Sequence, residues 1–230
     1  MLYLITGVSG SGKSEYAENL AVRLSSGAPL YYAATMEPYG AEGQARIARH
    51  HKLRAGKGFR TIECYRNIAR IVDEIGREQC CDAVILLECM SNLLANEMFA
   101  AESAAARTDM SGAASDMSGA ASHAARQKDN RAWCGGQQPE SQETDGISSR
   151  LLSEICCILR QCKHLIIVTN DIFSDGIVYM PETQAYMREL GRLNRQLADM
   201  AGEAVEVVYG IPMRIPAGNA ISHEKNDAME

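Results

Sequence analysis

Short apolar runs alternate along this chain with segments in which apolar residues recur at helical spacing. Most of the apolar runs are rich in β-branched or aromatic residues and are closed by polar residues or glycine, which predicts buried strands. We expect strands at 2–6, 29–35, 59–63, 82–88, 164–170 and 204–210. We expect helices at 13–25, 45–53, 67–77, 91–106, 149–161 and 182–201.

Strands that alternate with helices predict an α/β domain with a mostly parallel sheet. A tight Gly-Ile-Pro turn follows the strand at 204–210, so residues 211–215 are expected to form an antiparallel C-terminal edge strand. At this length the chain suits one domain, which we place at residues 1–215.

A low-complexity stretch interrupts the pattern between about residues 102 and 146. It contains a direct repeat, in which the sequence DMSGAAS at 109–115 returns at 116–122. Such a composition offers little apolar surface to bury, so we expect a surface insertion and not a second domain. The polar and charged residues 216–230 predict a disordered tail.

The overall composition excludes several classes of function. Of the 230 residues 46% are hydrophobic and 23% are charged, and the net charge of −6 makes nucleic acid an unexpected partner. The eight cysteines include no C-x-x-C pair, so we expect reduced thiols and no zinc site. No apolar run approaches the ~20 residues of a membrane span, and no secretory signal precedes the first strand. We therefore expect a cytoplasmic protein.

The most informative stretch is GVSGSGKS at 7–14, which matches the pattern G-x-x-x-x-G-K-[ST]. It lies between a predicted strand and a predicted helix, the context in which this pattern forms a phosphate-binding loop. Glycines let backbone N–H groups approach phosphate oxygens, and the helix N-terminus adds partial positive charge. The residues expected to bind nucleotide are Gly7, Val8, Ser9, Gly10, Ser11, Gly12, Lys13 and Ser14.

Two of these residues have more specific expected roles. Lys13 is expected to reach the β- and γ-phosphates and to act in catalysis, and the Ser14 hydroxyl is expected to bind Mg²⁺. Glu88 closes the strand at 82–88, where a carboxylate is typical of a Mg²⁺-binding Walker B strand. A helix cap or a surface acid is the alternative for Glu88. Thr35 also ends a predicted strand, at the edge where ligands of parallel sheets bind.

Further short motifs follow along the chain: YAAT at 32–35, RIARH at 46–50, TIE at 61–63, LLEC at 86–89, VTND at 168–171, GIV at 176–178 and GRLNR at 191–195. In this order and at this spacing the chain resembles the bifunctional adenosylcobinamide kinase/adenosylcobinamide-phosphate guanylyltransferases of cobalamin biosynthesis. The resemblance covers nearly the whole chain except the insertion and the tail. It implies a P-loop NTPase fold of the RecA-like class.

The resemblance implies two reactions: an NTP phosphorylates adenosylcobinamide, and GMP then passes from GTP to adenosylcobinamide phosphate. In that family a histidine of the R-I-x-x-H segment carries the GMP covalently, and this position falls on His50. Covalent transfer splits one difficult displacement into two easier ones. GTP and ATP are the implied nucleotides and Mg²⁺ the implied cofactor. The implied assembly is a homotrimer with the active site near the subunit interface.

The resemblance also implies a nucleotide contact for Glu63, and Arg54 is a candidate phosphate contact. Without it, both residues would be interpreted as solvated charges, and His50 and His51 as part of a basic helix face. Helix neighbours point about 100° apart, and the spacing from Arg46 selects His50. The chain departs from the family pattern at Gly10, where an arginine is frequent, and at Phe59, where a tryptophan is usual.

Two other functions stay open on the sequence. One is a P-loop kinase of a small molecule, without guanylyl transfer, in which His50 is incidental. The other is a nucleotide-binding module without turnover, which the intact Lys13, His50 and Glu88 disfavour. A GTPase switch is disfavoured because the base-reading motif N-K-x-D is absent.

Overall fold

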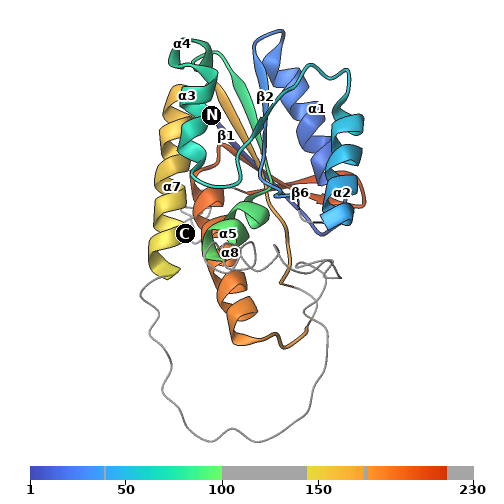
Figure 1. Cartoon of the computed structure of the whole chain (residues 1–230), viewed down its shortest axis with the longest axis vertical. Coiled ribbons are helices and arrows are strands. Elements are labelled where there is room, and N and C mark those ends of the chain that lie inside the picture. Colours follow the sequence, from blue (N-terminus) through green and yellow to red (C-terminus); the bar gives the residue numbers. More distant parts are fainter. Residues whose placement is uncertain (39, 100–143, 174–175, 217–230) are drawn as a thin grey trace, which may run out of the picture.

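The structure, a computed structural model, describes residues 1–38, 40–99, 144–173 and 176–216 (Figure 1). Within two helices the description leaves out the side chains of residues 41, 42, 45, 46, 50, 51, 53, 144 and 145. The predictions of an insertion at 102–143 and of a disordered tail from 217 onward fall outside the described residues.

A seven-stranded sheet forms the centre of the protein, with strand order β3-β2-β4-β5-β1-β6-β7. The strands are β1 (Leu2–Thr6), β2 (Leu30–Ala34), β3 (Arg60–Glu63), β4 (Val84–Glu88), β5 (His164–Val168), β6 (Glu203–Val208) and β7 (Ile211–Ile215). All neighbouring strands are parallel except β6 and β7. The prediction of a mostly parallel sheet flanked by helices, with an antiparallel C-terminal edge, is confirmed.

Helices cover both faces of the sheet. On one face lie α1 (Lys13–Ser25) and α2 (Gly40–Arg54), seen together at the right of Figure 1. The other face carries η1 (Ile68–Arg70), α3 (Ile71–Ile75), α4 (Arg77–Cys80), α5 (Met90–Met98), α7 (Thr144–Gln161) and α8 (Pro181–Met200). None of the helices in the described part of the chain is long and apolar enough to cross a membrane.

The alternation of side chains along each strand builds two cores. In β1, Leu2 and Leu4 enter the core under α7 and α8, whereas Tyr3 and Ile5 enter the core under α1. Central parallel strands are buried on both faces, which explains why the predicted strands are near-continuous apolar runs.

The predicted helix at 67–77 is wrong as one continuous element. Gly76 breaks it with a φ of 85° and separates α3 from α4, because glycine adopts this backbone region at low cost. The predicted apolar face is nevertheless confirmed: it is buried beside α7 at Ile68, Ile71, Val72 and Ile75.

Other helix ends differ from the predictions. Helix α2 begins at Gly40 and not at residue 45, although two glycines in its first turn lower the helix propensity by roughly 1 kcal/mol each. Helix α5 ends at Met98, and the predicted continuation from residue 100 falls outside the described residues. Helix α7 begins at Thr144, so the last three positions of the predicted insertion belong to a helix.

Candidate nucleotide site

The loop between β1 and α1 has the backbone that a phosphate-binding loop requires. Gly7, Gly10 and Gly12 have φ values of 151°, 75° and 90°, which residues with a side chain rarely adopt. A Cβ on Gly7 would lie 2.6 Å from the carbonyl oxygen of Val207 in β6. Among the described residues no side chain caps the N-terminus of α1, so its first N–H groups can bind an anion.

Lys13 lies across this loop. Its ammonium donates a hydrogen bond to the carbonyl oxygen of Val8 at 3.0 Å, and the residue is only 7% exposed. Burial lowers the pKa of Lys13, an effect that the nearby Cys89 and Glu88 oppose. The Lys13 ammonium is held at the loop by this hydrogen bond, and its other N–H groups can donate to a phosphate oxygen.

Glu88 is the centre of a short polar network at the end of β4. The Ser14 hydroxyl donates to its Oε1, and the Tyr32 hydroxyl donates to its Oε2 at 2.8 Å. Burial and the neighbouring Glu88 carboxylate raise the pKa of Tyr32, which therefore stays a donor. Two predicted metal ligands, Ser14 and Glu88, are thus brought together by the fold.

Their chemistry fits Mg²⁺. This ion takes hard oxygen ligands and binds through one or two protein groups together with water and substrate phosphates. A serine hydroxyl and a carboxylate beside the P-loop supply that kind of set. Among the described residues no three His, Cys, Asp or Glu side chains form a metal cluster.

Tyr32 also contacts the second helix of this face. The guanidinium of Arg54 lies over the Tyr32 ring, 3.4 Å from its centroid, and Arg54 is buried. Phe59 packs edge-on against the same ring at 6.0 Å. Lys57, just beyond α2, donates to the buried Glu18 of α1 at 2.5 Å. Arg54 is therefore not a solvated charge; it helps fix the C-terminal end of α2.

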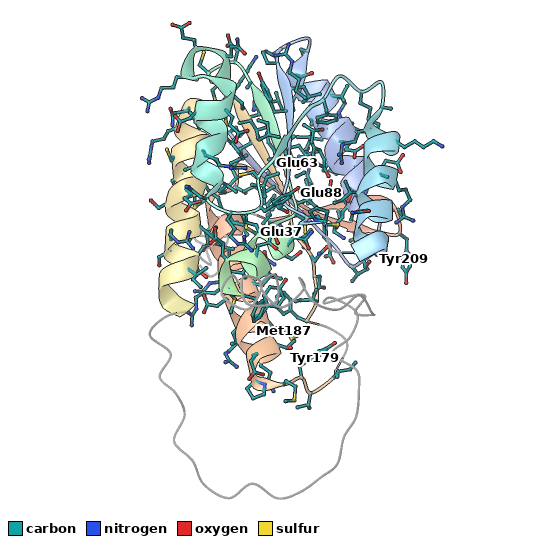
Figure 2. All side chains as sticks on the ribbon, viewed as in Figure 1. Glu37, Glu63, Glu88, Tyr179, Met187 and Tyr209 are labelled. Carbon is teal, nitrogen blue, oxygen red and sulfur yellow. The ribbon has the colours of Figure 1, made fainter. Side chains whose placement is uncertain are left out.

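Glu63 lies in the same row of the sheet as Glu88. Both residues are in register with Ala34 of β2, one from each side, which puts their backbones roughly 10 Å apart. Figure 2 shows both carboxylates in one region of the molecule. Glu63 is exposed and accepts a hydrogen bond from Tyr65 at 2.7 Å, and burial together with this bond raises the pKa of Tyr65 to about 12.

Thr35, unlike the other predicted site residues whose side chains are described, is hydrogen-bonded to the backbone that follows β4. It is fully buried, and its hydroxyl donates to the carbonyl oxygen of Cys89 and accepts from the Cys89 N–H. The Asn96 amide donates to the Thr35 carbonyl oxygen. This burial favours a role in holding the backbone after Glu88 and not a direct nucleotide contact.

The polar residues that follow β5 lie beside the P-loop. The N–H of Asp171 donates to the carbonyl oxygen of Gly7 at 3.1 Å, so this loop abuts the P-loop. Asn170 donates to the Ser91 hydroxyl at 2.7 Å, and Thr169 donates to Asn194 of α8 at 2.7 Å. These contacts link the ends of β1, β4 and β5.

The backbone of His50 belongs to α2, one turn before Arg54. The side chains of His50 and His51 are outside the described part of the structure. The sequence interpretation missed Tyr32, Glu18 and Lys57. Part of the signal for Tyr32 was present, because Tyr32 shares a strand face with Ala34 near the end of the strand. Its hydrogen bond to Glu88, which is in register with Ala34, is seen only in the structure.

The chain is similar along nearly its whole length to two named bacterial proteins. The chain is 27% identical to the bifunctional adenosylcobalamin biosynthesis protein CobU of Salmonella typhimurium strain LT2, and 25% identical to the protein of that name from Escherichia coli K12. Each similarity extends over 223 residues, 94% of this chain and 99% of the relative.

Two solved structures are also similar, at low identity. The flagellar accessory protein FlaH of Methanocaldococcus jannaschii is 15% identical with a TM-score of 0.38, over 89% of this chain and 70% of that one. The ATPase domain of G40P is 10% identical with a TM-score of 0.42, over 89% and 68%.

A family model described as "Cobinamide kinase / cobinamide phosphate guanyltransferase" matches residues 3–215, from the first strand to the last. That range contains the P-loop, the Ser14–Glu88 pair and helix α2. The chain belongs to the cobinamide kinase/cobinamide phosphate guanyltransferase family.

Proposed function

We propose that this protein carries out both reactions of its family at the edge of the sheet beside the P-loop, with His50 as the carrier of GMP. The observation that carries the proposal is the convergence of Lys13, Ser14 and Glu88 at that edge. The substrates are cobinamide, in its adenosyl form, and its phosphate, with ATP or GTP as the nucleotide.

In the kinase reaction the P-loop holds the triphosphate. Backbone N–H groups at the start of α1 and the Lys13 ammonium neutralise the phosphate oxygens. The cobinamide hydroxyl oxygen attacks the γ-phosphorus and its proton is released to water; the bond to the β-phosphate oxygen breaks, and a nucleoside diphosphate leaves. Ser14 and Glu88 would hold Mg²⁺, which supplies further positive charge to the phosphates when bound.

In the guanylyl reaction a neutral imidazole nitrogen of His50 attacks the α-phosphorus of GTP, and pyrophosphate leaves. A phosphate oxygen of adenosylcobinamide phosphate then attacks the phosphoramidate. The P–N bond breaks, adenosylcobinamide-GDP forms and the imidazole is regenerated. Glu63, in register with Glu88 across β2, is proposed to contact the nucleotide. Arg54 is proposed to contact a phosphate of the nucleotide.

The anchoring of α2 supports this assignment. The stacking of Arg54 on Tyr32 and the ion pair of Lys57 with Glu18 hold the C-terminal end of α2 against β2 and α1. Helix α1 begins at the P-loop. The backbone of His50 lies one helical turn from that anchor. A nucleophile needs such a fixed support, because small displacements at the reacting atoms cost large factors in rate.

Labelling with GTP that is radioactive at the α-phosphate tests the carrier. We expect the protein to acquire an acid-labile, alkali-stable label that is lost in His50→Ala and kept in His51→Ala. GTP labelled at the γ-phosphate should leave no such label. If α-labelled GTP leaves the unmodified protein unlabelled, the protein is a small-molecule kinase in which His50 is incidental.

A second assay addresses the kinase reaction. Phosphorylation of cobinamide by ATP should be abolished in Lys13→Ala. If the unmodified protein binds ATP without any turnover of cobinamide, it is a binding module and not an enzyme.

The remaining parts of the proposal concern organisation. We propose one domain over residues 1–215, a cytoplasmic location and a homotrimer. Light scattering on the full chain measures the assembly directly, and a monomeric mass would contradict the trimer.

A further inference from the structure

Tyr209 is a tyrosine at a position where neither side-chain packing nor backbone conformation favours one. It lies in the tight turn between β6 and β7 with 93% of its surface exposed, so its ring buries almost nothing within the described structure. Its φ of 51° is in the left-handed region, which bulky residues rarely adopt and which such turns fill with Asn, Asp or Gly. A strained residue without a packing role points to function.

The turn that carries Tyr209 is attached to the P-loop. The N–H of Gly210 donates to the carbonyl oxygen of Ser11 at 2.8 Å. A Cβ added to Gly12 would lie 3.3 Å from the Cα of Gly210, so the two backbones are in close contact at the start of α1. Figure 2 shows Tyr209 at the outer end of this hairpin. The exposed ring of Tyr209 therefore belongs to the residue next to Gly210, which contacts the phosphate-binding loop.

We propose that Tyr209 is the platform on which the purine base of the P-loop nucleotide stacks. A nucleotide whose phosphates lie on residues 7–14 extends its ribose and base beyond the loop. A rigid aromatic ring binds a base with little loss of side-chain freedom. Every base presents a π-face, so stacking on Tyr209 serves ATP and GTP alike. The inference rests on the proposed binding of nucleotide at the P-loop and is independent of His50.

Four variants of the full chain separate the ring from the turn. Tyr209→Phe and Tyr209→Trp keep an aromatic ring. Tyr209→Ala removes it. Tyr209→Asn also removes it but suits the left-handed backbone, so this variant controls for damage to the turn.

The measurements are the KM of the kinase step for ATP and for GTP, and the inhibition constant of inorganic tripolyphosphate. We expect Tyr209→Asn and Tyr209→Ala to raise both KM values by about fivefold or more, and the two aromatic variants to stay within about twofold of the unmodified protein. Inhibition by tripolyphosphate should be unchanged in all four, because this ligand has a phosphate chain and no base.

Three results would overturn the inference. The first is an unchanged KM in Tyr209→Asn. The second is a tripolyphosphate constant that rises as much as the KM for ATP, which would mean that the turn shapes the loop. The third is a KM rise that accompanies a smaller assembly in light scattering, which would make Tyr209 a subunit contact. Failure of tripolyphosphate to compete with ATP in the unmodified protein would instead contradict the P-loop assignment itself.

Discussion

Arg54 stacks on Tyr32, with the guanidinium carbon 3.4 Å from the centre of the ring. The same tyrosine donates its hydroxyl hydrogen to Glu88, which also accepts from Ser14 of the P-loop. One side chain therefore connects helix α2 to the carboxylate at the end of β4. Tyr32 therefore lies between the helix proposed to carry GMP and the proposed metal ligands. A change at Arg54, on the α2 side, should mainly slow guanylylation, and a change at the Tyr32 hydroxyl, on the Glu88 side, should mainly impair the use of Mg²⁺.

Replacing Arg54 by Gln should weaken the attachment of α2. A desolvated cation–π contact is worth about 2 kcal/mol, so we expect a loss of stability of that order. Guanylylation of the protein should slow more than cobinamide phosphorylation, because His50 lies one turn from Arg54 in α2. Urea unfolding and the two rates measure this. Arg49→Gln, at an exposed position of the same helix, is the control and should change neither. Equal slowing of both reactions in Arg54→Gln would contradict the prediction.

Tyr32→Phe should impair the use of Mg²⁺. The variant keeps the ring under Arg54 and removes only the hydrogen bond to Glu88. Loss of a group that orients a metal ligand typically costs tenfold or more in metal affinity, so we expect the Mg²⁺ concentration for half-maximal kinase activity to rise by about tenfold. Tyr31→Phe is the matched control, since the adjacent Tyr31 faces the other core and its hydroxyl contacts Gln79. A similar shift in both variants would refute a specific role for Tyr32.

Gly7→Ala should disrupt the P-loop by steric conflict. The added Cβ would meet the backbone oxygen of Val207 at 2.6 Å, and a backbone atom cannot move aside cheaply. We expect a loss of about 2 kcal/mol or more in stability and a marked rise in the KM for ATP. In Gly10→Ala the new Cβ meets no atom of the described residues within 4 Å, so the expected cost is that of a φ of 75°, roughly 1 kcal/mol. Denaturation midpoints that fall equally in the two variants would contradict this account.

His164 should make the folded state sensitive to mild acid. Burial, together with the positive charges of the N-terminus and Lys163, lowers its pKa from the ordinary 6.5. The unfolded chain therefore takes up a proton at a higher pH than the folded protein. The contribution of His164 to stability is complete above about pH 6.5, declines as the pH drops toward the folded-state pKa, and changes no further below it.

The test compares the unmodified protein with His164→Gln. We expect the free energy of unfolding of the unmodified protein to decline more steeply between about pH 6.5 and pH 5 than that of the variant. Urea unfolding at several pH values measures both slopes. Parallel curves would show that His164 does not contribute to the acid sensitivity.

Much of the site could be predicted where the signal is local. The spacing of Gly7, Gly12 and Lys13 specifies a loop and a helix start within eight residues, and the structure has both. Glu88 was predictable because the carboxyl end of a buried parallel strand is a ligand edge. The break at Gly76 was not predictable from periodicity, because the predicted apolar face ends at Ile75, just before it. A glycine inside a helical pattern can be tolerated or can end the helix, and the pattern alone does not say which.

The sequence by itself determined the apolar runs that become strands, the P-loop and the class of the sheet, because these depend on residues close together in the chain. The tertiary structure alone decided that β5 lies between β1 and β4, that Tyr32 links Arg54 to Glu88, and that the Tyr209 turn abuts Ser11. The physical reason is that each of these contacts joins residues that are far apart along the chain. They meet only when the two cores pack, and no local propensity encodes which partners the packing brings together.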